Sequence, residues 1–484
     1  MSNQVDDEVY YGIIPLLPKD KIYGFWDILL ITSGFAIATW CYVQGGYCAT
    51  LLGIKSVILN TFFSITLAAL FVVSVALVAT RLGTDIWVYQ RAVYGHIGVN
   101  IFLLVLFAAG WGWYAINAQM FGSSISKLLA AGGINLSPNM VVLLSLVCVL
   151  GGWYIAIKGP IAVRIATWVM VPSLFLVGVA ILIMVFTQYS WPELLAMKPI
   201  NAGLYNSPRE TFMMIAEWNI AFVFAWFPVI GALPRLVKTE REGYWGTVIG
   251  FGVVMAMFIC IGAVTGLIMS QSGMPSSDPT DWLLALGGAK LGLISLFLIG
   301  IANISTAAAG TYSLCLSTKI VKPDIEYWKV ATFWGLWLVL LTVWGGVWKY
   351  YPVFLALMGV TAAPGIGLIV MDYFIVRKGK ISMQALYKVD GDNRFVYTKG
   401  FNLVGVGSLL LGIVVYFSVY DPINTVARLP IFNYTTAALL SAAVAMLTYY
   451  AASKIPAVRR YLKLERDEGE QAVNSEDLTG VTTN

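Results

Sequence analysis

The sequence predicts an all-α integral membrane protein with about twelve membrane-spanning helices. Of its 484 residues, 59% are hydrophobic and only 11% are charged, whereas soluble chains average about a quarter charged residues. The apolar residues form runs of roughly the 20 residues that a spanning helix needs, separated by Gly, Pro and charged residues. The net charge of +5 is too small to indicate a nucleic-acid partner.

Twelve apolar runs can be located along the chain. In order they cover about 25–52, 56–80, 94–121, 140–157, 163–187, 210–234, 244–271, 286–317, 327–347, 350–376, 402–420 and 430–452. The first, third, eighth and tenth exceed a straight span, so we expect them to be tilted, broken or extended. The tail, 453–484, is charged and then rich in Ser, Thr and Asn, so we expect it to be mobile.

Basic residues are divided unevenly between the connectors. If the N-terminal segment, 1–24, lies in the cytoplasm, the cytoplasmic segments carry 23 of the 30 Lys and Arg residues. Because basic loops favour the cytoplasmic side, we predict that both termini lie there and that the protein resides in the inner (plasma) membrane. The first 24 residues lack a basic start followed by an apolar core, so we expect no cleaved signal peptide.

Residue types typical of catalysis or metal binding are sparse. The five cysteines lie in apolar stretches without CxxC spacing, which predicts buried thiols rather than disulfides or a zinc site. His96 is the only histidine. The sequence offers no nucleophile–base pair for an enzyme and no repeated charged ring for a channel, so a carrier is the favoured class.

Small and polar residues interrupt the first run near Gly34. They weaken the helix, and freed backbone carbonyls are tolerated in a membrane only where they face a cavity or an ion. Many transporters bind substrate and cation at such interrupted helices. Glycines also permit close helix packing, and this stretch alone does not decide between the two interpretations.

The eighth run contains a compact set of oxygen atoms. The hydroxyls of Ser305 and Thr306 and the carbonyl of Ala302, one turn earlier, suit a hard monovalent cation if another helix adds carbonyls. The competing interpretation is that both hydroxyls bond back to their own helix, and taken alone these residues favour it.

Aromatic and polar residues in the third and sixth runs indicate a binding site. Trp113 and Asn117 share a helix face, where an indole could stack a flat ring and an amide could bind its edge. Trp226 precedes Pro228 in the sixth run. Glu217, about two turns into that run, indicates proton coupling or a counter-charge for a cation; a hydrated position near the surface is the alternative.

Four segments together resemble the nucleobase–cation symporter family, which includes cytosine, hydantoin and allantoin permeases. The most specific is 364–378, which ends in Asp-Tyr-Phe followed by a basic cluster, as in the family. Segments 381–387 and 397–402 match its I-S-x-x-x-L-Y and G-x-N order, and 81–95 resembles the connector between its second and third helices. The similarity extends over roughly 430 residues.

The resemblance implies a LeuT-like fold, in which two inverted repeats of five helices precede two extra helices. The repeats would be about 25–187 and 210–376, and the extra helices about 402–452, within a transporter domain of 25–452. The first and sixth helices become the paired interrupted ones, in agreement with Gly34 and Pro228.

The resemblance also implies a sodium ion between the first and eighth helices. Residue by residue, the match assigns its ligands to the carbonyls of Gly34, Ile37 and Ala302 and the hydroxyls of Ser305 and Thr306. All five positions can supply the needed oxygen, so we expect coupling to Na+ rather than to protons.

The family match further implies a substrate site around a stacked ring. Its positions would be Ala38, Trp113, Asn117, Ala225, Trp226, Ala309 and Thr311. Glu217 joins these candidates as a carboxylate within a span and not through the family match. In the sixth helix Trp226 with Ala225 fits the pattern, although counting back from Arg235 would select Phe222 and Val223.

Two positions depart from the family pattern. Relatives carry Asn just after the hydroxyl pair, whereas this chain has alanines and glycine at 307–310. Ala232 takes the place of a sixth-helix Asp. Because buried polar groups need partners, a pyrimidine lactam cannot be bound here in the family's usual way.

We therefore expect a secondary active transporter, and not an enzyme, that imports a small nitrogen-rich heterocycle with Na+ by alternating access. Its expected partners are the substrate and membrane lipid, with no nucleic acid, and we expect a monomer. The alternative is a symporter of a small organic cation, an amidine or a quaternary amine. In that case aromatic rings would supply cation–π faces and Glu217 the counter-charge.

Overall fold

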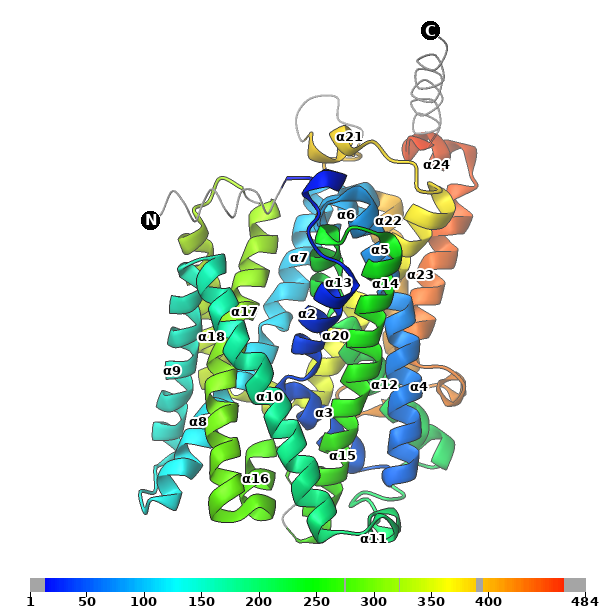
Figure 1. The fold of residues 1–484 in the computed structure, drawn as a ribbon. Coiled ribbons are helices and arrows are strands. Elements are labelled where there is room, and N and C mark those ends of the chain that lie inside the picture. The colour runs from blue at the N-terminus through cyan, green and yellow to red at the C-terminus, as the bar shows by residue number, and fades with distance from the viewer. Residues whose placement is uncertain (1–13, 274–275, 322, 389–394, 465–484) are drawn as a thin grey trace.

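The computed structural model describes residues 14–273, 276–321, 323–388 and 395–464 (Figure 1). Most of the N-terminal segment considered for a signal peptide, and most of the tail expected to be mobile, lie outside these residues.

Long helices run side by side through most of the molecule (Figure 1). In the part of the chain that the structure describes, eight segments are long and apolar enough to cross a membrane. They are formed by α4 (Ile54–Val72) with α5 (Ser74–Leu82), α7 (His96–Gly110) with α8 (Gly112–Ala131), α9 (Pro138–Ile157), α10 (Pro160–Gln188), α14 (Glu240–Val248) with α15 (Met255–Gln271), α17 (Leu293–Val321), α18 (Tyr327–Trp344) and α20 (Tyr351–Val370).

Two further spans are broken. The first combines α2 (Phe25–Ala36) with α3 (Thr39–Ala49) at a bend of 55°, and the second combines α12 (Pro208–Phe224) with α13 (Phe227–Ala232) and a following turn at 40°. With the shorter apolar helices α22 (Leu403–Val419) and α23 (Ala437–Ser453), these spans match the twelve predicted runs. The interrupted helices are the first and the sixth, as expected for two five-helix repeats.

Short elements fill the connectors, and the sequence did not predict them because they fall far below the length of a span. The helices are η1 (Pro18–Asp20), α6 (Ile86–Tyr94), α11 (Trp191–Ala196), η2 (Leu233–Leu236), α16 (Pro279–Gly287), α19 (Gly346–Lys349), α21 (Met383–Tyr387), η6 (Pro430–Asn433) and α24 (Pro456–Tyr461). Strands β1 (Tyr420–Asp421) and β2 (Val426–Ala427) pair antiparallel. Wide π-type turns occur at η3 (Ile249–Val254), η4 (Gly288–Gly292) and η5 (Met371–Val376).

The eighth predicted run starts too early. Residues 286 and 287 end α16, and the chain then turns at Gly288, whose φ of +58° is a backbone conformation that glycine adopts without strain. The span itself begins at Lys290, in the π-type turns that lead into α17.

The first helix breaks at residues 37–38, about one turn after Gly34. Ala38 is extended, with φ −67° and ψ 163°. Two freed carbonyls find side-chain donors, because the Trp40 indole donates to Phe35 O (3.2 Å) and the Cys41 thiol lies 2.8 Å from Ala36 O. Gly34 also serves packing, since a Cβ there would lie 2.9 Å from a Val171 methyl. The stretch therefore combines a broken helix with close helix packing, and the binding of a substrate or cation there stays a prediction.

The second break, at Ala225–Trp226, follows from Pro228. Proline has no N–H for the carbonyl of Phe224 four residues earlier, and its ring crowds that carbonyl. The α-helix therefore ends at Phe224 and restarts at Phe227.

Helices α3 and α15 touch backbone to backbone. A Cβ on Gly45 would lie 2.0 Å from Ile259 O, and one on Gly262 would lie 2.3 Å from Tyr42 O. Glycine is the side chain that permits such an approach, as in close helix pairs in membranes.

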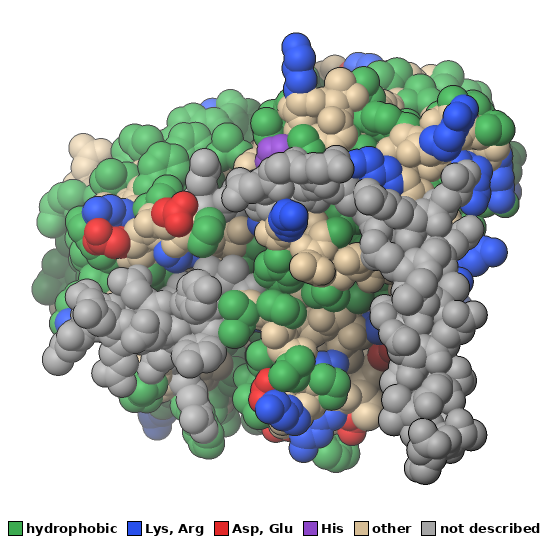
Figure 2. Space-filling model, turned by 90° about the horizontal axis from the view of Figure 1, so that it is seen from above, with side chains coloured by type: hydrophobic (Ala, Val, Ile, Leu, Met, Phe, Trp, Pro, Cys, Tyr) green, Lys and Arg blue, Asp and Glu red, His purple; other side chains and the backbone are tan. Residues whose placement is uncertain are grey.

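One end of the molecule carries α6, α21 and α24 (Figure 1). Seen from this end, the surface shows more Lys and Arg than Asp and Glu (Figure 2). Beneath it, Asp372 and Arg377 form an ion pair at 3.0 Å with both side chains fully buried. Tyr89 and Tyr449 also donate to Asp372, at 2.6 and 2.8 Å, so this cluster joins three helical segments.

Candidate functional site

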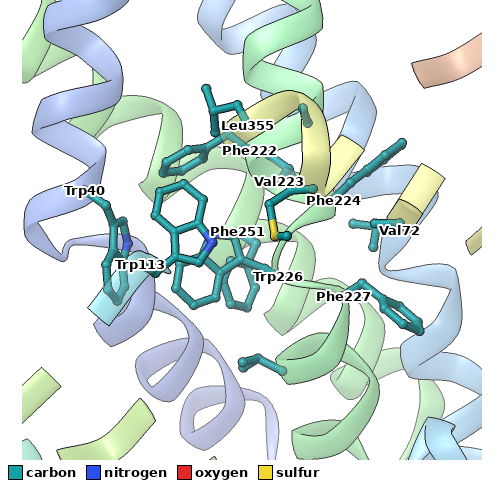
Figure 3. Close-up of a cluster of buried hydrophobic side chains, with 14 of the residues drawn as sticks. Trp40, Val72, Trp113, Phe222, Val223, Phe224, Trp226, Phe227, Phe251 and Leu355 are labelled. Carbon is teal, nitrogen blue, oxygen red and sulfur yellow. The ribbon is translucent and has the colours of Figure 1, made fainter. Parts of the chain in front are cut away.

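A group of indole rings lies where the two broken helices meet α8. Trp113 of α8 and Trp226 at the sixth-helix break are nearly parallel, with ring centroids 6.2 Å apart and an interplanar angle of 24°. Trp40 of α3 lies 4.8 Å from Trp226 (Figure 3). The structure therefore brings the two predicted ring-stacking residues face to face.

Both candidate registers of the sixth helix place an aromatic ring on Trp113. Phe222 meets it edge-on at 5.1 Å, whereas Trp226 lies parallel to it. Ala225 and Trp226 also line a cavity beside Trp113, and Phe222 does not. A stacked ring needs a parallel face, so the geometry favours Trp226 with Ala225.

The cavity beside these rings is small. Its volume is about 20 Å³, close to the smallest space that holds one water molecule. A flat ring between two indoles needs about 7–8 Å, twice the ordinary carbon contact distance, and the centroids are 6.2 Å apart. A substrate can enter only if the two indoles separate.

Thr39, Asn117 and Asn303 form a second group, which we call the amide triad. The Thr39 hydroxyl lies 2.8 Å from Asn117 Oδ1 and 3.0 Å from Asn303 Oδ1. All three residues are at most 1% exposed. The triad joins the broken first helix to α8 and to α17.

The hydrogen bond between Thr39 and Asn303 aligns the first break with the eighth helix. Ile37 is two residues before Thr39, and Ala302 directly precedes Asn303, so two groups of predicted sodium ligands lie on neighbouring segments. Within the described residues, no donor bonds to the carbonyl oxygens of Gly34 and Ile37. These carbonyls therefore keep their lone pairs without a hydrogen-bond donor.

The two α17 hydroxyls bond back to their own helix. Thr306 donates to Ala302 O at 2.8 Å, and Ser305 makes a long contact of 3.4 Å with Ile301 O. The competing sequence interpretation is therefore what the structure shows. A hydroxyl that donates its hydrogen keeps its lone pairs, so this arrangement is compatible with cation binding.

Residues 307–310, which follow Ser305 and Thr306 and lack the family's asparagine, are closely packed. A Cβ on Gly152 of α9 would lie 2.7 Å from the Ala307 methyl. A Cβ on Gly310 would lie 1.8 Å from the Tyr114 ring of α8. The eighth helix packs here against its neighbours with no room for larger groups at these two contacts.

A larger cavity of about 290 Å³, which we call the vestibule, lies between the sixth-helix break and the end that carries α6. Its walls include Asp85, Arg235 and Ser313, and Pro228 and Val229 line both this cavity and the smaller one. The vestibule is therefore adjacent to the cavity beside the aromatic rings.

Asp85 is the acidic group of the vestibule. It accepts a hydrogen bond from Trp87 N at 3.0 Å and so begins α6. Burial raises the pKa of Asp85 to about 6, although Trp87 N–H and the charge of Arg235 oppose this shift.

Glu217 lies apart from both cavities. Its Oε2 accepts from Ala438 N at 3.1 Å in the first turn of α23, and among the described residues its Oε1 has no hydrogen-bond partner. Ala38, Ala309 and Thr311 are buried, and they do not line either cavity.

Thr39 and Asn303 are the residues that sequence reasoning missed. Each directly follows a residue that the sequence predicted for the site: Thr39 follows Ala38, and Asn303 follows Ala302. The available signal was an amide in mid-span, since polar side chains within a membrane mark functional sites.

A family model described as a permease for cytosine/purines, uracil, thiamine and allantoin matches residues 19–448. Among curated proteins, the allantoin permease of Bacillus subtilis is 28% identical over 234 residues, 46% of this chain and 46% of that protein. The purine-uracil permease NCS1 of Arabidopsis thaliana is 24% identical over 436 residues, 83% of this chain and 69% of its own length. The hydantoin permease of Microbacterium maritypicum is 22% identical over 439 residues, 84% of either chain. The match to the allantoin permease thus spans about half of that relative.

Solved structures confirm the expected LeuT-like fold. Mhp1, a nucleobase-cation-symport-1 family transporter, in a closed conformation with bromovinylhydantoin, gives a TM-score of 0.72 at 18% identity, over 94% of this chain and 99% of that one. Its inward-facing conformation gives 0.74 at 16% identity, over 93% and 96%.

Proposed function

Because the chain belongs to the family of permeases for cytosine/purines, uracil, thiamine and allantoin, we propose that it imports a small, flat, nitrogen-rich heterocycle together with Na+. Members of this family are transporters, and this chain is a multi-pass membrane protein. The sodium coupling, the substrate class and the direction are our proposal, and transport proceeds by alternating access.

The observation that carries the proposal is the pair of contacts made by Thr39. They set the unwound residues of the first helix against α8 and α17 at once. A ligand that binds at this junction can therefore act on three helices, as alternating access requires.

We assign Na+ to the junction of the first break with α17. The carbonyls of Gly34, Ile37 and Ala302 and the hydroxyls of Ser305 and Thr306 are the neutral oxygens that suit a hard monovalent ion. The two unpaired first-helix carbonyls support this assignment. A bound cation would balance the negative ends of these dipoles.

The substrate ring lies between Trp113 and Trp226, with Asn117 at its edge and Ala225 beside it. Ala38, Ala309 and Thr311 complete the wall once the aromatic rings separate. The vestibule is the path to the cytoplasm, because Pro228 and Val229 border both cavities.

We place both termini and the end with α6, α21 and α24 in the cytoplasm, and the protein in the inner (plasma) membrane as a monomer. The excess of Lys and Arg on that end supports this orientation. The repeat limits of 25–187 and 210–376 belong to the same proposal.

The test is ligand binding by purified protein, followed by uptake into proteoliposomes. Uracil, hypoxanthine, hydantoin and allantoin are measured in Na+ and in K+. We expect Na+ to raise the affinity of the bound heterocycle, and that heterocycle to raise Na+ affinity by the same factor. Equal affinities in Na+ and K+ would contradict sodium coupling.

A matched pair of variants locates the ion. Thr306→Ala removes a proposed ligand and should weaken Na+ affinity about tenfold, the equivalent of one modest interaction. Thr332→Ala on α18 removes a hydroxyl that likewise bonds to its own helix, at Trp328 O, and should leave Na+ affinity unchanged.

The organic-cation alternative lacks support from the geometry. It requires Glu217 as a counter-charge at the aromatic rings, whereas the contact of Glu217 is with the first turn of α23. The proposed substrate is therefore the heterocycle.

A further inference from the structure

The hydrogen atoms of the amide triad can be counted. The Thr39 hydroxyl lies within hydrogen-bond distance of two amide oxygens, on Asn117 and Asn303. It has one hydrogen, so it can donate to only one of them. The other amide must be turned so that its NH2 group donates to the Thr39 oxygen, since amide oxygen and nitrogen are assigned from the hydrogen-bond network.

This count leaves an unpaired donor and an unpaired acceptor. Among the described side chains, the Nδ2 atoms of Asn117 and Asn303 have no hydrogen-bond partner. When one amide turns, one hydrogen of its NH2 bonds to Thr39 and its oxygen is released, while the NH2 of the other amide stays free. Whichever amide turns, the triad presents unpaired N–H donors and one released carbonyl acceptor in a buried site, where unpaired groups are costly.

The free pair has a defined chemical complement. A lactam or ureide edge carries an N–H beside a C=O and would satisfy both groups at once. A quaternary amine offers neither a donor nor an acceptor. The triad therefore matches a neutral ring with an amide edge.

The position of the triad fits such a ring. Asn117 lies one helical turn beyond Trp113 on the same face of α8, which is about 6 Å along the axis. Thr39 precedes Trp40, whose ring contacts Trp113 and Trp226. A ring stacked on Trp113 can therefore direct its edge toward the triad.

We propose that Thr39 and Asn303, together with Asn117, form the subsite that reads the amide edge of the substrate. This inference rests on the proposed function and specifies which residues select the substrate. The amide of the eighth helix comes from the turn before the hydroxyl pair, at Asn303, while 307–310 pack closely. Asn303 adjoins Ala302 and Thr39 adjoins the first break, so the segments that bind Na+ also hold the subsite.

The test compares heterocycles with and without a lactam N–H. Binding of uracil, hydantoin and hypoxanthine is measured against 1,3-dimethyluracil, 1,3-dimethylhydantoin and 1-methylhypoxanthine in Na+. We expect the wild-type protein to prefer the unmethylated member of at least one pair by about 10- to 100-fold, because a hydrogen-bonding site rejects analogues that leave it unpaired.

Four variants connect this preference to the triad. Thr39→Val and Asn303→Ala should reduce it to less than about threefold, the remainder reflecting only the size of the methyl group. Thr39→Ser keeps the hydroxyl and should retain the preference. Thr265→Val is the matched control, because Thr265 is a buried threonine whose hydroxyl bonds to its own helix, α15.

The outcomes separate the two proposals. If the wild-type protein binds both members of every pair equally, the subsite is wrong while transport of heterocycles stands; this arm needs no variant to fold. If Thr39→Val and Asn303→Ala bind the parent compound and keep the wild-type preference, the subsite is also wrong. If the wild-type protein binds none of the six compounds, the proposed function fails and the subsite with it.

Discussion

Two buried polar clusters of this protein differ in whether their hydrogen bonds are complete. The second cluster, which we call the outer network, joins α3, α4, α12 and α20 and consists of Gln44, Asn60, Ser64, Asn219 and Tyr351. Its amide nitrogens all donate: that of Gln44 to Asn219 Oδ1 (2.9 Å), that of Asn219 to Asn60 Oδ1 (3.2 Å) and Ser64 Oγ (3.1 Å), and that of Asn60 to Phe212 O (2.7 Å). In the amide triad at least one of the two amide nitrogens has no partner, whichever amide turns its NH2 toward Thr39.

The comparison teaches that burial alone does not identify a binding site. Both clusters contain fully buried asparagines in helices that meet near a break. A completed network holds helices together, whereas an incomplete one keeps hydrogen-bonding capacity for a ligand. Stability should therefore depend on the outer network, and ligand selection on the triad.

The largest expected effect is in the outer network. Asn219→Ala removes the main acceptor of the Gln44 amide and one donor to each of Asn60 Oδ1 and Ser64 Oγ. A buried polar group left without its partner costs about 1–3 kcal/mol. We expect the free energy of unfolding to fall by about 3 kcal/mol, measured by denaturation in detergent. Ser270→Ala on α15 removes a hydroxyl bonded only to its own helix and is the control. If Asn219→Ala lowered the free energy of unfolding by less than about 1 kcal/mol, the outer network would not be the cluster on which stability depends.

The next effect concerns the charged group of the vestibule. Burial raises the pKa of Asp85 to about 6, above its value in the unfolded chain, so the native state binds this proton more tightly. Stability is therefore lost as pH rises from about 4 to about 6. Asp85→Asn should be more stable than wild type at pH 7.5 by up to about 3 kcal/mol, and the difference should disappear near pH 4.

Asp421 supplies a control of opposite sign. Arg428 and Asn424 hold the pKa of Asp421 well below its usual range. Its contribution is present above the unfolded pKa of 3.8 and is lost as pH falls. Asp421→Asn should therefore lower the melting temperature at pH 7.5, and the difference should shrink below pH 3.8. If both variants shifted in the same direction, the assignment to Asp85 would fail.

Glu217 is intermediate between the two clusters in its hydrogen bonding, because one of its carboxylate oxygens has a hydrogen-bond partner and the other has none among the described residues. Glu217→Gln keeps an acceptor for Ala438 N and removes the charge. We expect stability to change by about 1 kcal/mol at most and heterocycle affinity to stay within about twofold, which is under 0.5 kcal/mol. If Glu217→Gln instead bound cationic amines with a much higher or lower affinity than the wild-type protein, the result would support Glu217 as a counter-charge.

The smallest expected change in stability is in the triad. Asn303→Ala removes one contact of the Thr39 hydroxyl, which keeps Asn117 as a partner, so unfolding free energy should stay within about 1 kcal/mol of wild type. A loss as large as that of Asn219→Ala would place the triad among the structural networks.

Much of the fold follows from composition, but the site depends on contacts that sequence does not display. Runs of apolar residues locate the spans, and Gly34 and Pro228 indicate both broken helices. The first break falls at 37–38 because the side chains of Trp40 and Cys41 reach the carbonyls freed there, which no local pattern specifies.

The polar contacts were beyond sequence reasoning for a similar cause. Asn303 is visible as an amide in an apolar run, but its partner Thr39 lies 264 residues away in the chain. Glu217 is visible as a buried carboxylate, yet its contact, Ala438 N, is 221 residues further on. Only the packing of the helices distinguishes a residue that binds a ligand from one that holds another helix.

The glycine contact between α3 and α15 has a mechanical consequence. Where side chains separate two helices, they can change rotamer and let the helices slide; Gly45 and Gly262 leave backbone directly on backbone. We therefore expect α3, the second half of the first helix, to move together with α15. Rotation within the first helix should then occur at residues 37–38, beside the proposed sodium ligands and directly before Thr39.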